Sequence, residues 1–370
     1  MEEIKNANIF GSVYKGKRVL VTGHTGFKGS WLTLWLLQLG AKVGGFSKYL
    51  PSEPCLFNYL NIRDKIENFE GNINELSDVK NAFEKFEPEI VFHLAAQPIV
   101  RKSYDDPKET FDINIGGTVV VLDCIRIVKG VDAGVIITSD KCYENFGLER
   151  GYVETDPLGG SDPYSASKGC AEIVTRSYFR SFFNKNGMPR IASARAGNVI
   201  GGGDWAQDRI IPDCVKAWQK GEDVIVRKPE ATRPWQHVLE SLGGYLWLGA
   251  SLLLHEEING EAFNFGPKEE GVGSVGALTD MFLKCLGSGE WKHIPLEKEK
   301  KEANLLTLNC DKALDKLKWQ PVLDFKETVE MTALWYKKFY EDSEAIESFS
   351  ISQINSYVNK AKEKSIKWAS

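Results

Sequence analysis

The sequence predicts an α/β fold in which a doubly wound parallel sheet is accompanied by a smaller α/β lobe. A short apolar run at residues 18–21 leads through a glycine-rich turn into a helical run that ends at Gly40. Further apolar runs of strand length at 41–46, 70–73, 88–94 and 135–138 alternate with helical segments. Such alternation is typical of a parallel sheet with helices on both faces. From residue 198 onward, glycine-rich and aromatic segments with little periodicity indicate the second lobe.

The turn after the first strand holds three glycines at a spacing of three: Gly23, Gly26 and Gly29. Between a strand and a helix, the first lets the chain turn tightly and the second lets backbone N–H groups approach a pyrophosphate. The third lets the helix pack closely on the strand. The helix N-terminus then faces the phosphates with its partial positive charge. The turn therefore predicts a Rossmann-type dinucleotide site. Its other expected members are Thr25, Phe27 and Lys28.

We expect the carboxyl ends of the strands to converge on one crevice, because ligands of doubly wound sheets bind there. Further cofactor-binding candidates at these ends are Asn72, Ile73, Leu94, Ala95, Ala96 and, on the helix at 107–128, Asn114. An acidic residue often ends the second strand, about 20 residues after the turn, and holds the adenosine ribose. Here Ser47 and Lys48 occupy that region. We expect NAD with Ser47 as the hydroxyl partner; NADP, with Lys48 at the 2′-phosphate, is the alternative.

Tyr164 and Lys168 form a Y-x-x-x-K pattern on an expected helix, so their side chains share one face. We expect the Lys168 ammonium and a bound nicotinamide cation to lower the pKa of Tyr164 toward neutrality. The phenol would then serve as a general base. The pattern follows the glycine turn and a strand that opens into Ser139, and this joint order is far more specific than the pattern alone.

Several irregular segments resemble the nucleotide-sugar 4,6-dehydratases, which belong to the extended short-chain dehydrogenase/reductase superfamily. The segments are GHTGFKGSW (23–31), TSDK (138–141), DPYSASKGCAE (162–172), RAGNVIGGGDW (195–205) and RPWQHV (233–238). The resemblance runs from about residue 14 to the C-terminal region and is strongest to the branch that acts on CDP-glucose. It implies NAD as the cofactor, CDP-glucose as the substrate, and a place in deoxysugar synthesis for lipopolysaccharide O-antigen.

The resemblance also implies a redox-neutral cycle. Tyr164, supported by Lys168, would remove the proton of the sugar 4-hydroxyl while hydride passes from C4 to NAD, and Ser139 would hydrogen-bond the 4-oxygen. Asp140 matches the acid that protonates the departing 6-hydroxyl, after which hydride returns to C6 and gives a 4-keto-6-deoxy sugar. Relatives that act on dTDP- and GDP-sugars have Glu beside this Asp as the C5 base. This chain has Lys141 there, which leaves the C5 base open.

The irregular loops supply candidates for substrate binding. Asn198 and Arg233 are candidates for the substrate diphosphate, since arginine donates two parallel hydrogen bonds to phosphate oxygens. The other substrate-binding candidates are Gln97, Ser103, Trp205, Arg209 and Trp235. We expect His93 to be a hydrogen-bonded structural residue in a buried strand. For His24 we expect the backbone to matter more than the ring, and Lys28 would either approach a cofactor phosphate or be solvated.

The composition excludes several classes of partner. The 370 residues include 42% hydrophobic and 26% charged ones and carry a net charge of −5, so neither nucleic acid nor an anionic membrane is expected to bind. Seven scattered cysteines show no C-x-x-C and no zinc spacing, which predicts no metal site and reduced thiols in the cytoplasm. No apolar run approaches the roughly 18 residues of a membrane span.

We expect a dinucleotide-binding domain over residues 1–197, with further sheet and helix segments from about 238–262. An interleaved substrate-binding lobe should cover mainly 198–345, and a solvated helical tail 346–370. In proteins of the family, the helices that correspond to those holding Asn114 and Tyr164 form a four-helix bundle, so the resemblance implies a homodimer.

Two rival functions stay open. The first is another nucleotide-sugar enzyme, in particular a 4-epimerase on the same scaffold, which would need no acid and base beside the serine. Asp140 and Lys141 argue against the epimerase. The second is a non-catalytic dinucleotide sensor; such proteins usually lose the tyrosine or the lysine of the pair, and this chain keeps Tyr164, Lys168 and Ser139.

Overall fold

The computed structural model describes residues 9–268, 272–294 and 306–370. Residues 1–8 of the expected dinucleotide-binding domain, and 269–271 and 295–305 of the expected lobe, lie outside the described residues. Within the described chain, seven strands form one parallel sheet in the order β11-β6-β5-β4-β1-β2-β3. They are β1 (Arg18–Thr22), β2 (Lys42–Ser47), β3 (Glu67–Glu70), β4 (Ile90–His93), β5 (Ala133–Ile137), β6 (Arg190–Arg195) and β11 (Ala262–Asn264). The expected doubly wound parallel sheet is confirmed.

Both faces of the central strands are buried, so β1, β4 and β5 are rich in apolar residues throughout rather than alternating. Val19 and Val21 belong to the larger core, whereas Leu20 between them belongs to a second core on the opposite face. The expected third strand at 70–73 is wrong, because β3 pairs with β2 over 67–70. This edge strand, ENFE, is largely exposed, so it has no apolar run that could mark it in the sequence.

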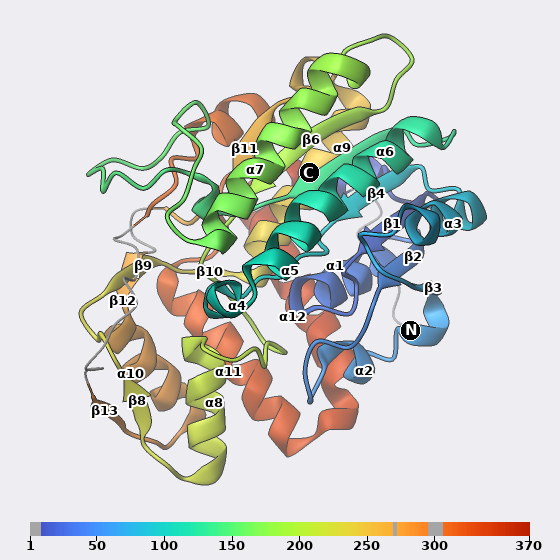
Figure 1. Cartoon of the computed structure of the whole chain (residues 1–370). Coiled ribbons are helices and arrows are strands. Elements are labelled where there is room, and N and C mark those ends of the chain that lie inside the picture. Colours follow the sequence, from blue (N-terminus) through green and yellow to red (C-terminus); the bar gives the residue numbers. More distant parts are fainter. Residues whose placement is uncertain (1–8, 269–271, 295–305) are drawn as a thin grey trace.

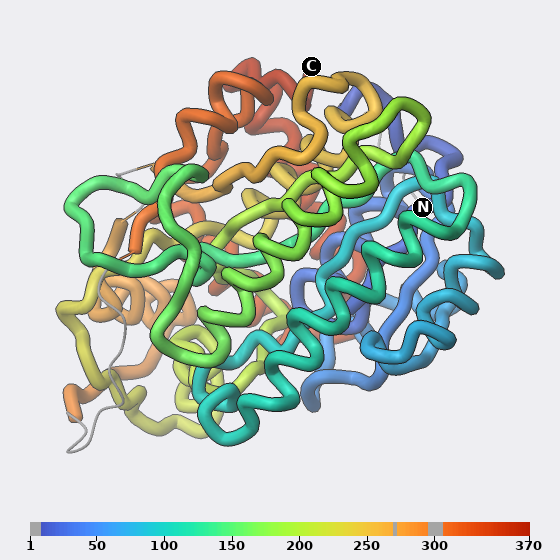
Figure 2. Tube along the Cα trace, turned by 45° about the horizontal axis from the view of Figure 1, so that its top comes forward, coloured from blue at the N-terminus to red at the C-terminus, as the bar shows by residue number. Residues whose placement is uncertain are grey.

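Helices cover both faces of the sheet (Figure 1). Those of the first half and α9 are α1 (Phe27–Gln38), α2 (Leu56–Tyr59), α3 (Leu76–Phe86), α4 (Val100–Asp105), α5 (Pro107–Phe111), α6 (Gly117–Ile127), α7 (Pro163–Tyr178) and α9 (Val238–Leu254). α1 and α9 pack on the face with the larger core, and α3, α6 and α7 on the other. α6 and α7 lie side by side in both views (Figures 1 and 2). Among the described residues, no helix has the length and apolar character needed to span a membrane.

A smaller group of elements is built mainly from the second half of the chain and gathers beside the sheet (Figure 1). Its helices are α8 (Ile210–Lys220), α10 (Val275–Leu286) and α11 (Phe325–Glu341). Its strands pair as β7 (Val199–Ile200) with β10 (Gln236–His237), β8 (Val224–Val226) with β13 (Trp291–His293), and β9 (Thr232–Pro234) with β12 (Val272–Ser274). Between β10 and β12 the chain returns to the main sheet to form α9 and β11.

The expectation of a solvated C-terminal tail is wrong. α12 (Ile346–Glu363) buries one face, and Trp368 beyond it is fully buried. The Trp368 ring stacks on Phe10 with centroids 4.9 Å apart and meets Trp35 of α1 edge-on at 6.3 Å. The charged residues of α12 alternate with the apolar residues that form its buried face, so in the sequence this face is visible only as helical spacing. The tail therefore closes the core on the α1 face of the sheet.

A buried carboxylate fastens this tail to α9. Glu240 accepts hydrogen bonds from the Val322 N–H at 2.8 Å and from the Tyr357 hydroxyl at 2.8 Å. Burial raises the pKa of Glu240 to about 7, although these donors oppose the shift. The α12 helix is thus held by a satisfied polar contact as well as by aromatic packing.

Candidate active site at the carboxyl edge of the sheet

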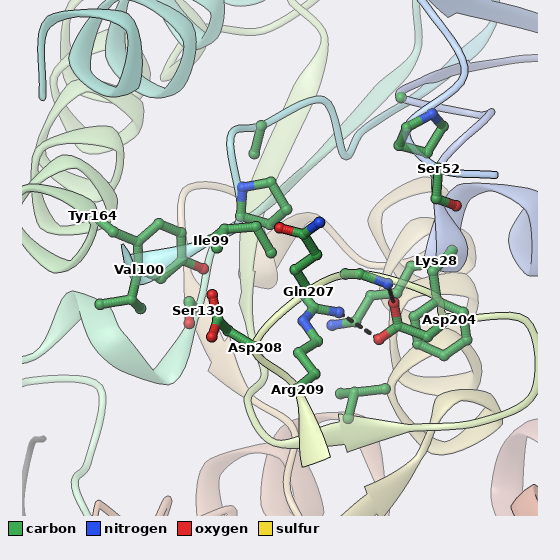
Figure 3. Close-up of a pocket in the computed structure, with 18 of the residues that line it drawn as sticks. Lys28, Ser52, Ile99, Val100, Ser139, Tyr164, Asp204, Gln207, Asp208 and Arg209 are labelled. Atoms are coloured by element: carbon green, nitrogen blue, oxygen red, sulfur yellow. Dashed lines mark hydrogen bonds and ion pairs between the residues drawn. The ribbon is translucent and has the colours of Figure 1, made fainter. Parts of the chain in front are cut away.

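A crevice of about 1350 Å³ lies between the carboxyl edge of the sheet and the smaller lobe. Its walls come from the glycine turn after β1, the ends of β2, β4 and β5, the start of α7, and the lobe segment 196–213. It opens outside β1 and β4, the neighbouring strands at which the strand order reverses. Figure 3 shows side chains from these separate segments pointing into one space.

The glycine turn has the geometry that a dinucleotide requires. Gly23 has a φ of +74°, and a Cβ there would lie 2.8 Å from the backbone nitrogen of Ala95. At Gly29, a Cβ would lie 2.1 Å from the carbonyl oxygen of Gly23, so α1 packs directly on the turn. α1 begins after Gly26 without a side-chain cap, which leaves its first N–H groups available to an anion. These features fit a cofactor pyrophosphate.

The remaining expected cofactor residues line the same crevice, with the exception of Asn114. The lining ones are Thr25, Phe27, Lys28, Ser47, Asn72, Ile73, Leu94, Ala95, Ala96, Tyr164 and Lys168. Asn114 lies behind the wall, where it accepts from the Gln97 N–H at 2.8 Å and donates to Ser167 Oγ at 2.8 Å. The expectation that Asn114 binds the cofactor is corrected, because its amide is already used to join the segment after β4 to α7.

Two expected substrate residues are also absent from the lining. The Gln97 side chain accepts from the Ile99 N–H at 2.6 Å and donates to Thr110 at 2.9 Å. Ser103 Oγ accepts from the Tyr164 N–H at 3.2 Å. Their polar groups turn toward neighbouring backbone and side chains, so in this structure they shape the wall and the start of α7. Asn198, Trp205, Arg209, Arg233 and Trp235 do line the crevice.

Ser139 connects the expected catalytic side chains. Its Oγ donates to Asp140 Oδ1 at 2.8 Å and accepts from the Lys141 N–H at 3.2 Å, and the Ser139 side chain lowers the pKa of the neighbouring Tyr164 phenol. Asn198 Nδ2 donates to Asp140 Oδ2 at 3.3 Å. The side chains of Ser139, Asp140 and Asn198 thus form one hydrogen-bonded chain at the crevice wall, and the Tyr164 phenol lies beside Ser139. This arrangement can move or hold a proton between a phenol and a carboxylate.

The Asp140 carboxylate fits a niche that only glycine leaves open. A Cβ on Gly197 would lie 2.1 Å from Asp140 Cγ and 2.2 and 2.3 Å from its two oxygens. The next residue, Asn198, has a φ of +51°, a left-handed conformation that Asn tolerates well. The loop after β6 therefore both makes room for Asp140 and turns an amide toward it.

The pKa of Tyr164 does not fall toward neutrality in the protein alone, and the fall expected with a bound nicotinamide cation stays a prediction. Burial raises the pKa of Tyr164 to about 12, although the Ser139 hydrogen bond and the Arg209 charge lower it. Burial likewise lowers the pKa of Lys168 to about 8, while the Glu172 carboxylate opposes that shift. The i, i+4 spacing brings both side chains to one face, but the same face is shielded from water, which favours the neutral form of each.

A second polar group, opposite Tyr164 in the view of Figure 3, contains Lys28, Asp204 and Arg209. Arg209 donates to Asp204 Oδ2 at 2.7 Å, and Lys28 Nζ donates to the Tyr245 hydroxyl at 3.2 Å. Burial and the Arg209 charge lower the pKa of Lys28 to about 7. Lys28 is partly exposed and lines the crevice, so both alternatives, a cofactor phosphate and solvent, stay open for its ammonium.

An ion-pair bridge in the crevice wall has no signal in the sequence. Arg101 of α4 donates to Asp208 Oδ1 at 2.7 Å, and Arg227 after β8 approaches the same oxygen at 3.5 Å. All three residues line the crevice. Arg101 and Arg227 are more than 100 residues apart in the sequence, and no motif links them, so only the fold brings them together.

The two histidines near the cofactor residues behave differently from one another. His93 bonds Thr22 at 2.8 Å and Thr118 at 3.3 Å inside the sheet, which confirms the expected structural role. The expectation for His24 is wrong, because its buried ring bonds Ser47 Oγ at 3.0 Å and Asn68 Oδ1 at 2.6 Å. The ring therefore links the glycine turn to Ser47 at the end of β2 and to Asn68 of β3.

We expect Gly197→Ala to lower turnover by about 10²-fold, because the added methyl would displace the Asp140 carboxylate and misplacement of about 1 Å can cost that much. The measurement is steady-state turnover together with thermal unfolding. Gly116→Ala is the matched control, since a Cβ there meets only Asn74 Oδ1 at 3.6 Å. A Gly197→Ala protein with near wild-type turnover would show that the Asp140 position is not critical.

Comparisons with known proteins agree with this geometry. The chain is 44% identical over 328 residues to CDP-glucose 4,6-dehydratase of Salmonella typhimurium, covering 88% of this chain and 91% of that protein. It is 25% identical to dTDP-glucose 4,6-dehydratase of Haemophilus influenzae, covering 86% of this chain and 97% of that protein.

Solved structures share the fold. A dTDP-glucose 4,6-dehydratase of Streptomyces venezuelae, solved with NAD bound, superposes with a TM-score of 0.75 at 21% identity and covers 90% of this chain and 99% of that one. A UDP-glucose 4-epimerase of Thermotoga maritima superposes with a TM-score of 0.74 at 23% identity and covers 87% of this chain and 99% of that one. Residues 20–332 match the family model described as GDP-mannose 4,6 dehydratase. With this match over most of its length, and with the glycine turn and the Tyr164–Lys168 helix in one crevice, the chain belongs to the GDP-mannose 4,6 dehydratase family.

Proposed function

We propose that the protein is a hydro-lyase that converts CDP-D-glucose to CDP-4-keto-6-deoxy-D-glucose with bound NAD. The observation that carries this proposal is the placement of the Tyr164 phenol beside the hydrogen-bonded Ser139 and Asp140, with Lys141 next to them. The 44% identity to a CDP-glucose 4,6-dehydratase supports the choice of CDP-glucose. Such a product is a precursor of deoxysugars, and we place the reaction in deoxysugar synthesis for lipopolysaccharide O-antigen.

We assign the cofactor to the half of the crevice formed by the glycine turn and the ends of β2, β3 and β4. The pyrophosphate would lie at the uncapped N-terminus of α1, and Ser47, Asn72 and Ile73 would surround the adenosine. Leu94, Ala95 and Ala96 would lie along the cofactor. When bound, NAD supplies an oxidant at the sugar C4 and returns the same reducing equivalent at C6, so none is consumed.

Within this proposal, Tyr164 takes the proton of the sugar 4-hydroxyl. Burial raises the pKa of Tyr164 to about 12, so the phenolate must be stabilised before it can accept this proton. The neighbouring Ser139 hydroxyl would supply part of this stabilisation, and the Lys168 ammonium on the same face of α7 would supply more. With a pKa of about 8, Lys168 is mostly charged at pH 7. Ser139 then also holds the 4-oxygen.

Loss of water across C5 and C6 requires an acid and a base. We assign Asp140 as the acid for the departing 6-oxygen, since it lies one hydrogen bond from Ser139 and is buried. Lys141 is the candidate for the C5 base, and it must be uncharged to accept a proton. The alternative is that Lys141 stays charged and stabilises the enolate oxygen while another group takes the proton.

The sugar nucleotide would occupy the lobe half of the crevice. Arg209, Arg233 and Asn198 line it and offer donors for the diphosphate, and arginine suits phosphate because it donates two parallel hydrogen bonds. Trp205 and Trp235 line the same half. Trp205 is packed against Phe339 with ring centroids 4.9 Å apart, so it would present a fixed surface rather than a mobile one.

Parallel incubation with CDP-glucose, dTDP-glucose, UDP-glucose and GDP-mannose tests the proposal, scored by the 4-keto product of each. We expect product from CDP-glucose, without net accumulation of reduced cofactor. The rival 4-epimerase would release no 4-keto sugar, and a dinucleotide sensor would turn over none of the four. Preferential turnover of another sugar nucleotide would contradict the assignment of cytosine as the nucleobase of the substrate.

We expect Lys141→Met to oxidise C4 and then stall, because the variant lacks the proposed C5 base, a loss worth about 10²–10⁴ in rate. The measurement is reduced-cofactor absorbance together with exchange of the C5 proton in D₂O, which should slow in parallel. Tyr164→Phe is the control, since it should stop earlier and show neither signal. Elimination of water by Lys141→Met at near wild-type rate would move the base to another residue.

We also propose a homodimer formed through α6 and α7, whose outer faces expose Ile127 and Ile173. These helices lie side by side on one face of the sheet, so two copies would make a four-helix bundle (Figure 1). Sedimentation equilibrium should report a dimer that Ile173→Glu dissociates; a wild-type monomer would contradict the proposal.

All seven cysteines are free thiols, which supports a reducing compartment such as the cytoplasm.

A further inference from the structure

We propose that His24 fixes the direction of the Ser47 hydroxyl, so that Ser47 accepts a hydrogen bond from the adenosine 2′-hydroxyl of NAD and disfavours NADP. The inference rests on the proposed function only for the presence of a dinucleotide. It gives a chemical reason for the missing acidic residue at the end of β2 and assigns a role to a histidine ring.

Ser47 occupies the place where a carboxylate would otherwise meet the ribose. It is the last residue of β2, it lines the crevice, and its Oγ lies 3.4 Å from the Thr25 N–H in the glycine turn. A carboxylate at this position works as an acceptor for ribose hydroxyls. A serine hydroxyl can either donate or accept, so by itself it would not distinguish a 2′-hydroxyl from a 2′-phosphate.

The His24 ring is held rigidly beside this hydroxyl. It is buried, and a Cβ on Gly45 of β2 would lie 2.4 Å from its Cδ2 and Cγ atoms, so the ring fills a space that glycine provides. Phe57 packs edge-on against it with centroids 5.1 Å apart. Nδ1 lies 3.0 Å from Ser47 Oγ, and Nε2 lies 2.6 Å from Asn68 Oδ1.

These contacts determine where the protons lie. The Asn68 Oδ1 oxygen can only accept, so Nε2 of His24 carries the ring proton. Burial lowers the pKa of His24 to about 4, which keeps the ring neutral at pH 7. Nδ1 is then an acceptor, and the Ser47 hydroxyl must donate its proton inward to it. One Ser47 lone pair takes the Thr25 N–H, and the other faces the crevice.

A hydroxyl with this polarity behaves as a neutral substitute for a carboxylate. It can accept from a ribose 2′-hydroxyl, but it has no proton left for a 2′-phosphate, whose oxygens are acceptors only. Lys48 is the opposing feature, because it lines the crevice next to Ser47 and could attract a phosphate. The inference therefore predicts that the Ser47 lone pair outweighs the Lys48 charge.

The test is a set of dissociation constants on the full chain, freed of bound nucleotide, for NAD, for the NAD analogue lacking the adenosine 2′-hydroxyl, and for NADP. Wild type should bind NAD about 3- to 10-fold more tightly than the analogue, the range for one neutral hydrogen bond. Ser47→Ala should weaken the binding of NAD to the level of the analogue and leave the binding of the analogue unchanged. Ser52→Ala, at another crevice serine, is the control and should keep the NAD-to-analogue ratio.

His24→Phe keeps an aromatic ring of similar shape but frees the Ser47 proton to point outward. It should raise the affinity for NADP relative to NAD about 3- to 10-fold, and this shift should vanish when Ser47→Ala is added. The proposal is overturned if Ser47→Ala weakens NAD and the analogue equally, or if wild type binds NADP as tightly as NAD. Should His24→Phe not fold, the NADP arm decides: a Ser47 hydroxyl that can only accept predicts that Ser47→Ala weakens NAD binding and leaves NADP binding unchanged, whereas a loss of NADP affinity would overturn the proposal. These binding ratios are independent of which sugar nucleotide is turned over.

Discussion

The buried ion pair between Glu172 and Arg195 is the contact on which the rest of the site depends. The guanidinium lies 2.8 Å from Glu172 Oε2, and both side chains are almost fully buried. Removing two charges from water is costly unless the remaining hydrogen-bonding capacity is used, and here Thr138 and Ser193 donate to the same carboxylate. Glu172 belongs to α7, Thr138 follows β5, and Arg195 ends β6. The pair therefore fixes α7 relative to two adjacent strands.

The three segments joined by this pair carry the proposed catalytic residues at short, fixed distances along the chain. Lys168 lies one helical turn before Glu172 and Tyr164 two turns before it, while Ser139 directly follows Thr138. Gly197, which leaves room for Asp140, comes two residues after Arg195. Arg195 also donates to the Tyr143 hydroxyl at 2.7 Å and so holds the segment just beyond Lys141. Hence the phenol, the serine and the carboxylate share one rigid frame.

Local patterns in the sequence predicted the parts of the site that a single segment defines. The glycine turn, the Y-x-x-x-K helix and the position of Ser139 each follow from spacing and from the end of a strand. What could not be predicted depends on segments that meet only in the fold. The roles of Asn114, the His24 ring and the C-terminal helix depend on partners that no local pattern reveals. The burial that raises the pKa of Tyr164 in the protein alone likewise cannot be read from spacing.

The proposed reaction requires that one crevice oxidise the sugar at C4 and reduce it at C6 without releasing the sugar between the two steps. Turnover of CDP-glucose deuterated at C4 is the most direct measurement of this coupling. We expect deuterium at C6 of the 4-keto-6-deoxy product, from the same substrate molecule when labelled and unlabelled CDP-glucose are mixed. Loss of the label to water, or its transfer between molecules, would show that the two steps are not coupled within one crevice.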